Sequence, residues 1–288
     1  MPTPTAATGG YDTPQQTVLA IDTHAHVFTR DLPLAGERRY APNYDALLSA
    51  YLAQLGTHGI AHGVLVQPSF LGTDNRYLLA ALAQERHRLR GIAVIAPVQA
   101  AADSAHLDAL ARGGVVGIRL NLFGAPDPNW ATQAWQTLLP RIAALGWQVE
   151  VHCEACRLRR VVPTLVAHGI NVVVDHFGRP DPALGVADPG FRDLLGFATS
   201  RRVWVKLSGA YRNGAGEAGV AVARAATPLL RTAFGLERLV WGSDWPHTQF
   251  EHDRRFENAY ALIHELLPDD DDRRVVLVET PARLFKFD

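Results

Sequence analysis

The sequence predicts an α/β protein, and more narrowly a (β/α)8 TIM barrel, from three observations. Eight short apolar runs recur along the 288 residues, and most are rich in Val and Ile, as strands buried on both faces are. Segments with the apolar spacing of amphipathic helices separate these runs. "DTHAH" stands where an open, doubly wound sheet would carry a Gly-rich phosphate loop. The closed barrel is therefore the expected fold.

The predicted strands leave room for helical segments between them. In chain order the strands cover residues 18–27, 62–69, 90–97, 114–122, 147–153, 171–178, 203–209 and 239–246. The clearest predicted helix is "YDALLSAYLAQLGTHG", in which one apolar stripe contains Leu47, Tyr51, Leu52 and Leu55. The chain closes with "DDDDRRVVLVETPARLFKFD", which predicts one or two short helices.

Composition predicts one globular domain with no polyanionic partner. Hydrophobic residues make up 48% of the chain, which is ample for a core. We expect residues 18–288 to form a single barrel domain and residues 1–17, rich in Thr, Pro, Gly and Gln, to form a flexible leader. A net charge of −1 gives no general attraction to nucleic acid or to acidic membranes.

The lack of a recognisable targeting signal and the low cysteine content predict a cytoplasmic protein. The first residues lack the basic and apolar regions of a signal peptide, and no apolar run approaches the roughly 20 residues of a membrane span. The two cysteines, Cys153 and Cys156, make no disulfide framework, and a zinc ribbon would need a second pair. The oligomeric state stays open, because the apolar C-terminal "RLFKF" could cover either the helices of its own barrel or a neighbouring molecule.

Ionisable side chains end four of the predicted strands. His24 and His26 end the first strand, and a spacing of two places both imidazoles on one side of it. His152 ends the fifth strand, His176 the sixth and Asp244 the eighth. Singly, each has an ordinary explanation, such as a rim histidine or a helix cap. Because the strand ends of a barrel meet at one mouth, together they predict a functional site.

The roles of other charged residues are less determined by the sequence. Arg119, at the end of the fourth strand, would pair with a substrate carboxylate or with an acid of a neighbouring strand, such as Glu150 or Asp175. Lys206 on the seventh strand faces either the mouth or the helical layer. The remaining histidines and Arg76 are interpreted as surface, capping or helix-starting residues; His247, beside Asp244, is the least certain of them.

Several motifs resemble the amidohydrolase superfamily. The likeness is carried by "DTHAHVF" at the first strand, "VVDHFGRPD" at the sixth and "WGSDWPH" at the eighth, and it runs from about residue 18 to the C-terminus. "GERRYAP", "VQPSFLGTDNR" and "GIRLNL" are similar to its lactonase branch, which includes 2-pyrone-4,6-dicarboxylate lactonase. The resemblance implies an amidohydrolase-type barrel that opens a lactone, a cyclic ester, with activated water.

The resemblance also implies roles for individual residues. His24, His26 and His176 would surround the lactone carbonyl, and Asp244 would be the general base. An anionic substrate such as 2-pyrone-4,6-dicarboxylate would be bound by Tyr40, Ser69, Arg119, Arg179 and Arg212. This chain departs from the pyrone lactonases after the fourth strand, where "FGAPDPN" lacks an arginine. That departure weakens a carboxylate site, and relatives in the branch use sugar lactones or sulfomuconolactone.

The attacking water could be activated in two ways, with a bound metal or without one. The pyrone lactonases have a tyrosine where this chain has His152, so His24, His26, His152 and Asp244 form a ligand set that suits Zn²⁺ or Mn²⁺. Such a metal would lower the pKa of bound water to about 7. In the metal-free alternative, as in the pyrone lactonases, Asp244 takes the proton and the histidines donate to the oxyanion. The sequence favours a divalent metal slightly, with metal-free catalysis as the close alternative.

Three other functions fit parts of the pattern. A metal-dependent decarboxylase of an aromatic acid would share the first- and eighth-strand residues and release CO₂. A phosphoesterase of the TatD kind would need a carboxylate at the end of the fourth strand, where Arg119 and Asn121 stand instead. A non-catalytic barrel that binds a metal or an organic anion would not need Asp244 as a base. The expected partner is a small anionic lactone, with neither nucleic acid nor membrane involved.

Overall fold

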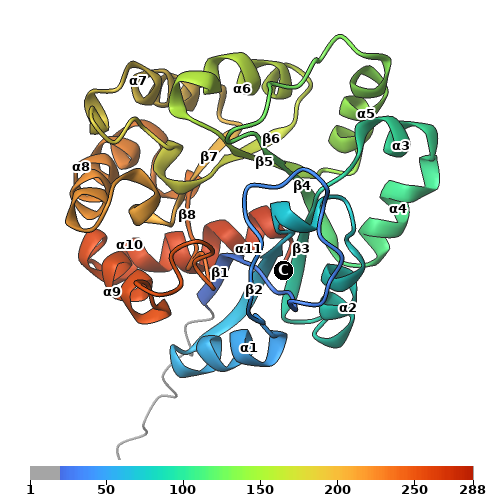
Figure 1. Ribbon diagram of the computed structural model, residues 1–288. Coiled ribbons are helices and arrows are strands. Elements are labelled where there is room, and N and C mark those ends of the chain that lie inside the picture. Colours follow the sequence, from blue (N-terminus) through green and yellow to red (C-terminus); the bar gives the residue numbers. More distant parts are fainter. Residues whose placement is uncertain (1–19, 288) are drawn as a thin grey trace, which may run out of the picture.

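The strands of the protein form one parallel eight-stranded sheet in the order β1 to β8 (Figure 1). The structure, a computed structural model, describes residues 20–287, so the predicted leader at 1–17 lies outside the described residues. The strands are β1 (Ala20–Ala25), β2 (Ile60–Val66), β3 (Leu89–Ala93), β4 (Val115–Asn121), β5 (Gln148–His152), β6 (Asn171–Val174), β7 (Val203–Leu207) and β8 (Leu239–Trp241). A parallel bridge between Ala25 and Trp245 joins the two ends of the sheet. The predicted barrel is confirmed.

Helices surround the barrel, as Figure 1 shows. They are α1 (Leu48–Thr57), α2 (Arg76–Gln84), α3 (Pro97–Ala102), α4 (Ser104–Arg112), α5 (Gln133–Ala144), α6 (Leu158–Ala167), α7 (Pro189–Gly196), α8 (Glu217–Phe234), α9 (Phe256–Leu266), α10 (Asp270–Arg274) and α11 (Thr280–Phe285). In the predicted first helix, Tyr51 and Leu55 are fully buried, as the apolar stripe requires. No helix within residues 20–287 is both long enough and apolar enough to cross a membrane.

The C-terminal helix α11 closes the barrel at the end opposite the predicted site. Phe285 is fully buried and packs in one cluster with Ile21, Ile92 and Val240, which come from three different strands. Burying a side chain of this size contributes roughly 1.5–3 kcal/mol. The apolar C-terminus therefore packs into its own barrel.

All eight strands end before the residue that the sequence predicts, and for β6 and β8 this difference decides where site residues lie. β6 ends at Val174 and β8 at Trp241, whereas the apolar runs continue to residues 178 and 246. His176 and Asp244 have φ values of +52 and +61, which a β-strand does not contain. Both side chains are therefore placed by the loops that follow their strands. A positive φ at a non-glycine residue is uncommon and concentrates at functional sites.

Candidate active site

Asp244 lies at the centre of the predicted site, in the loop after β8. Its N–H donates to the carbonyl of His24 at 2.8 Å. The carboxylate is fully buried, and its Oδ2 accepts hydrogen bonds from the Tyr211 hydroxyl at 2.6 Å and from Arg212 Nε at 2.5 Å. Burial by itself raises the pKa of Asp244, but the charge and hydrogen bonds of Arg212 lower it to about 2. Asp244 is therefore a carboxylate at neutral pH.

A second buried acid, Asp22 on β1, positions this loop. Its Oδ1 accepts from the Ser243 N–H at 2.8 Å, and its Oδ2 accepts from the Ser243 hydroxyl at 2.6 Å and from the Tyr51 hydroxyl at 3.1 Å. Burial raises the pKa of Asp22 to about 6, although the hydrogen bonds from Ser243 oppose this. Asp22 joins β1 to the loop after β8, so Asp244 is held against the first-strand histidines.

The predicted pair His24 and His26 meets Asp244. The Nε2 atoms of His24 and His26 lie 3.7 and 3.9 Å from Asp244 Oδ1. His26 Nδ1 lies 2.7 Å from the Val66 carbonyl oxygen, which can only accept, so Nδ1 carries the proton and Nε2 has a free lone pair. Burial lowers the pKa of His26 to about 4, and burial followed by the charge of Lys206 lowers the pKa of His24. Both imidazoles are neutral at neutral pH.

His152 and His176 extend this group of imidazoles. The ring centroid of His176 lies 5.1 Å from that of His24 and 5.0 Å from that of His152. His152 Nδ1 faces Arg119 Nη2 at 3.4 Å and must accept, so its proton is on Nε2. The Nε2 atoms of His24, His152 and His176 are buried and have no hydrogen-bond partner within residues 20–287. Buried polar atoms without a partner are costly, and a bound substrate can supply one.

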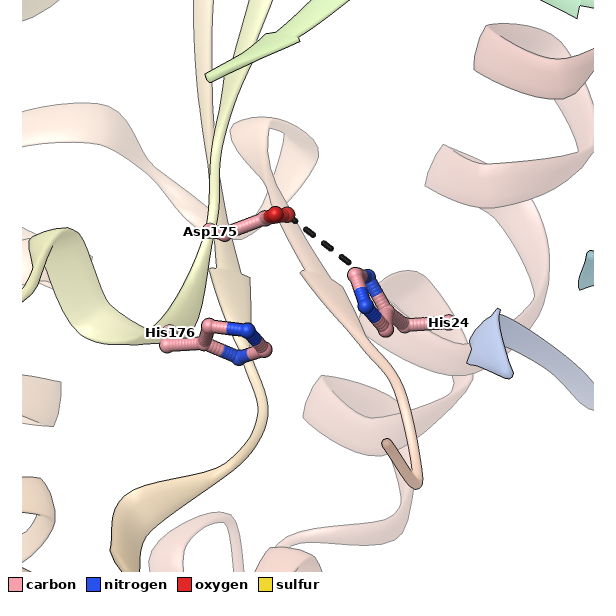
Figure 2. A group of neighbouring side chains, drawn as sticks. All are labelled: His24, Asp175 and His176. Atoms are coloured by element: carbon pink, nitrogen blue, oxygen red, sulfur yellow. Dashed lines mark ion pairs between the residues drawn. The ribbon is translucent and has the colours of Figure 1, made fainter. Parts of the chain in front are cut away.

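Buried acidic and basic side chains lie on the Nδ1 side of the His24 ring. Asp175 Oδ1 lies 3.6 Å from His24 Nδ1. Figure 2 marks this ion pair with a dashed line and also shows His176, the next residue after Asp175. Lys206 on β7 is fully buried and donates to Glu150 Oε1 at 2.8 Å. Arg119 donates to Asp175 Oδ2 at 3.0 Å, so a salt bridge with a neighbouring acid is confirmed for Arg119. Lys206 faces the barrel interior and not the helical layer.

A pocket of about 180 Å³ opens above these groups. All five residues predicted to bind substrate line it: Tyr40, Ser69, Arg119, Arg179 and Arg212. His26 and His152 also reach its surface, whereas His24, His176 and Asp244 are fully buried and lie beneath it. The segment between β1 and α1, blue in Figure 1, supplies Tyr40, whose hydroxyl donates to Glu251 Oε1 at 2.6 Å.

Two of the pocket arginines have no acidic partner within the described residues. Arg212 pairs with Asp244 and Arg119 with Asp175, but Arg179 and Arg39 have no ion pair with any residue from 20 to 287. The guanidinium carbons of Arg179 and Arg39 lie 4.4 and 4.9 Å from the ring centroid of Phe123. Burial, followed by the charge of Arg212, lowers the pKa of Arg179 to about 10. The pocket thus has uncompensated positive charge.

The sequence interpretation missed Arg39, Phe123 and Tyr211. Arg39 stands beside Tyr40 in "GERRYAP", and this adjacency is the signal in the sequence that points to it. Tyr211 precedes Arg212, and its contact with Asp244 has no signal in the sequence. The interpretation of His247 as a surface or capping residue is wrong: it is 3% exposed, because it packs against the Tyr211 ring at 6.0 Å.

Arg76 lies outside this pocket. It begins α2, and its guanidinium forms an exposed ion pair with Asp74 at 2.6 Å. The simplest interpretation of Arg76, a helix start, is confirmed.

The candidate metal ligands meet only in part. The ligand atoms of His24, His26 and Asp244 lie within 4.8 Å of one another, as do those of His24, Asp175 and His176, whereas His152 belongs to neither group. Asp244 accepts from Arg212 through both oxygens, at 2.5 and 3.2 Å. Lys206 Nζ lies 2.9 Å from His24 Nδ1, so the proton of His24 is on Nε2, where a metal would need a lone pair. In this arrangement the donor set does not fit a divalent cation.

Comparisons with known proteins agree with the motif resemblance. The family model "Amidohydrolase" matches residues 21–287. A 4-sulfomuconolactone hydrolase of Hydrogenophaga intermedia is 32% identical over 92% of this chain and 88% of its own length. Two solved structures are described as predicted 2-pyrone-4,6-dicarboxylic acid hydrolases. That from Pseudomonas putida is 47% identical with a TM-score of 0.87, covering 94% of this chain and 98% of its own. The structure from Acinetobacter baumannii, with citric acid bound, is 39% identical and has a TM-score of 0.89. The match covers 93% of this chain and 99% of the other.

A more distant solved structure shares the fold. An amidohydrolase of Burkholderia multivorans with bound zinc is 19% identical, covers 93% of this chain and 99% of its own, and has a TM-score of 0.78, which shows the shared fold alone. The family match spans nearly all of the described residues, and the curated relative exceeds 30% identity over most of the chain. The chain belongs to the amidohydrolase family.

Proposed function

We propose that this protein hydrolyses a small lactone with acidic groups, using water activated by Asp244 and no metal ion. One observation above all supports this: the buried, ionised Asp244 lies 3.7 Å from His24 Nε2, a buried nitrogen with no hydrogen-bond partner among residues 20–287. Ester hydrolysis needs a base for water and donors for the carbonyl oxygen. The relative from Hydrogenophaga intermedia, named as a lactone hydrolase, supports the reaction class.

In the proposed reaction the attacking water lies between Asp244 and His26. Asp244 Oδ1 and His26 Nε2 are two acceptors 3.9 Å apart, which one water can bridge by donating a hydrogen to each. The water oxygen bonds to the lactone carbonyl carbon as Asp244 takes the proton. A base positioned in this way accelerates such a step by roughly 10²–10⁴-fold.

The histidines accept the charge that develops on the carbonyl oxygen. His24 and His152 each have a proton on Nε2, so each donates to the oxyanion of the tetrahedral intermediate. A single donor of this kind contributes roughly 3–4 kcal/mol to the transition state. The intermediate collapses when the bond between the carbonyl carbon and the ring oxygen breaks. The ring oxygen takes the proton from Asp244, and the product is the open hydroxy acid.

The pocket charges favour a substrate with more than one acidic group. Arg179 and Arg39 have no acid partner within the described residues, and both lie over the Phe123 ring. Two uncompensated guanidinium groups suit two carboxylates, or a carboxylate and a sulfonate, because charge-assisted hydrogen bonds are the strongest available there. The segment "FGAPDPN" has no arginine, but Arg39 lies over its first residue, Phe123, and places a positive charge there. A dicarboxylate is therefore still among the proposed substrates.

A lactone panel tests the reaction class and the metal together. Proton release is followed with 2-pyrone-4,6-dicarboxylate, muconolactones, sulfomuconolactone and aldonolactones, before and after treatment with EDTA. We expect a diacidic lactone to open at a rate that chelation leaves unchanged. A rate abolished by EDTA and restored by zinc would overturn the metal-free mechanism. Release of CO₂ without lactone opening would indicate a decarboxylase, and anion binding without turnover would indicate a binding protein.

Substitution of Arg39 tests the proposed recognition of the second acidic group. Arg39→Gln is expected to raise KM roughly 10-fold or more for a diacidic lactone, since a hydrogen bond to a charged group contributes about 1.5–3 kcal/mol. It should change KM little for a lactone with a single acidic group. Arg38→Gln is the matched control, because Arg38 makes the same charge change while its guanidinium donates to the Ala35 carbonyl. Equal effects of the two variants would show that only net charge matters.

A further inference from the structure

Lys206 is a fully buried cation inside the barrel, and the proposed reaction gives it no direct role. Its ammonium donates to Glu150 Oε1 at 2.8 Å and to His24 Nδ1 at 2.9 Å, and it lies 3.3 Å from Asp175 Oδ1. These partners come from β5, β1 and the loop after β6. An ammonium has three hydrogens, so each has one acceptor nearby.

The charges of this group balance without any contribution from His24. Lys206 and Arg119 provide two positive charges, and Asp175 and ionised Glu150 provide two negative charges. Burial raises the pKa of Glu150 to about 7, and the charge of Lys206 opposes this rise. A neutral buried set of this kind does not require an additional imidazole for stability. The hydrogen bond from Lys206 to His24 is thus not needed to balance these charges, but it does determine which nitrogen of His24 carries the proton.

That consequence is the position of the His24 proton. An ammonium group can only donate, so His24 Nδ1 accepts and the ring proton is on Nε2. His24 Nε2 is buried, has no partner within residues 20–287 and lies 3.7 Å from Asp244 Oδ1, at the proposed reaction centre. The proton thus points to where the lactone carbonyl would bind.

Without Lys206 the same surroundings would favour the opposite tautomer. His24 Nδ1 lies 3.6 Å from Asp175 Oδ1 and 3.9 Å from Glu150 Oε2, and both carboxylates attract an N–H donor. Nε2 faces one carboxylate, Asp244 at 3.7 Å, whose charge Arg212 already pairs. A proton on Nδ1 would leave Nε2 with a lone pair, which cannot donate to an oxyanion. We propose that Lys206 is a positioning residue that keeps His24 in the Nε2–H tautomer and so makes it a donor to the substrate carbonyl. This inference rests on the proposed function.

Two variants separate this role from a merely structural one. Lys206→Met removes the donor to His24 Nδ1, and Glu150→Gln removes a charge from the same group while keeping the Lys206–His24 contact. We expect Lys206→Met to lower kcat roughly 10²–10³-fold, the loss typical of one oxyanion donor, with KM nearly unchanged. Glu150→Gln should lower the free energy of unfolding, since it also leaves two buried cations with one carboxylate, but the folded variant should retain most of kcat. If Lys206→Met does not fold, the double variant Lys206→Met, Glu150→Gln removes both charges and takes its place.

The tautomer itself is measured by two-bond ¹H–¹⁵N NMR on histidine-labelled protein, with His24→Gln used to assign the signals. We expect the Nε2–H pattern for His24 in the wild type and in Glu150→Gln, and the Nδ1–H pattern when Lys206 is replaced. An Nδ1–H pattern in the wild type, or an unchanged Nε2–H pattern without Lys206, would overturn the inference, as would equal loss of kcat in the two single variants. The spectra need no turnover, so they are interpretable even if no lactone is hydrolysed.

Discussion

Replacing Asp244 with Asn is expected to lower kcat for lactone opening by roughly 10²–10⁴-fold, because the amide cannot take a proton from water. Lactone binding should persist, since Arg119, Arg179 and the rest of the pocket keep their charges. Steady-state kinetics give the loss of kcat, and calorimetry with unhydrolysed lactone gives the affinity.

The pH dependence of kcat/KM is a second test of Asp244 as the base. Arg212 holds the pKa of Asp244 at about 2, so the base stays ionised down to that pH and is lost only below it. The wild-type kcat/KM should therefore show no fall from this group between pH 7 and pH 5. The matched control is Asp253→Asn, which neutralises an exposed carboxylate in the segment that follows Asp244. Turnover by Asp244→Asn at close to the wild-type rate would remove Asp244 from the mechanism.

Replacing Asp175 with Asn is expected to destabilise the protein by roughly 3–5 kcal/mol, the loss typical when one partner of a buried ion pair is removed. Asp175 is fully buried and faces both Arg119, at 3.0 Å, and Lys206, at 3.3 Å. The variant would leave two buried cations with a single carboxylate, Glu150. Urea unfolding followed by circular dichroism measures the change.

An exposed ion pair provides the comparison for Asp175. Asp45 pairs with Arg30 at 3.2 Å near the surface, and Asp45→Asn should leave the unfolding midpoint almost unchanged because water screens this pair. If Asp175→Asn unfolds at the same urea concentration as the wild type, then the buried charges do not stabilise the barrel as a group.

The barrel was predictable because its signal is repeated. Runs of Val and Ile at each strand, with helical stripes between them, leave few alternatives to a parallel sheet covered by helices. The site followed from the same logic, since His24, His26 and Asp244 lie at or just beyond the ends of strands that meet at one mouth. The strand ends were less predictable: His176 and Asp244 leave the sheet through positive φ values that their apolar neighbours do not reveal.

Apart from the Arg119–Asp175 ion pair, which is one of the alternatives that the sequence offers, pairing within the site could not be predicted because it depends on distances between strands. Arg212 resembles a substrate ligand in sequence, yet in the structure it binds Asp244 at 2.5 Å and lowers its pKa. Lys206 lies on a strand whose two faces are both buried, so alternation gives no sign of its direction. Arg39 reaches the pocket through the loop between β1 and α1, where Tyr40 packs against Phe70 at 5.9 Å.

The central claim is that a lactone carbonyl binds to imidazole N–H groups beside an ionised Asp244, with no metal between them. A crystal structure of Asp244→Asn with an unhydrolysed diacidic lactone measures this directly. We predict the carbonyl oxygen about 3 Å from the Nε2 atoms of His24 and His152, with acidic groups on Arg179 and Arg39. A metal ion bound by His24 and His26, or a lactone carbonyl pointing away from the imidazoles, would contradict the account.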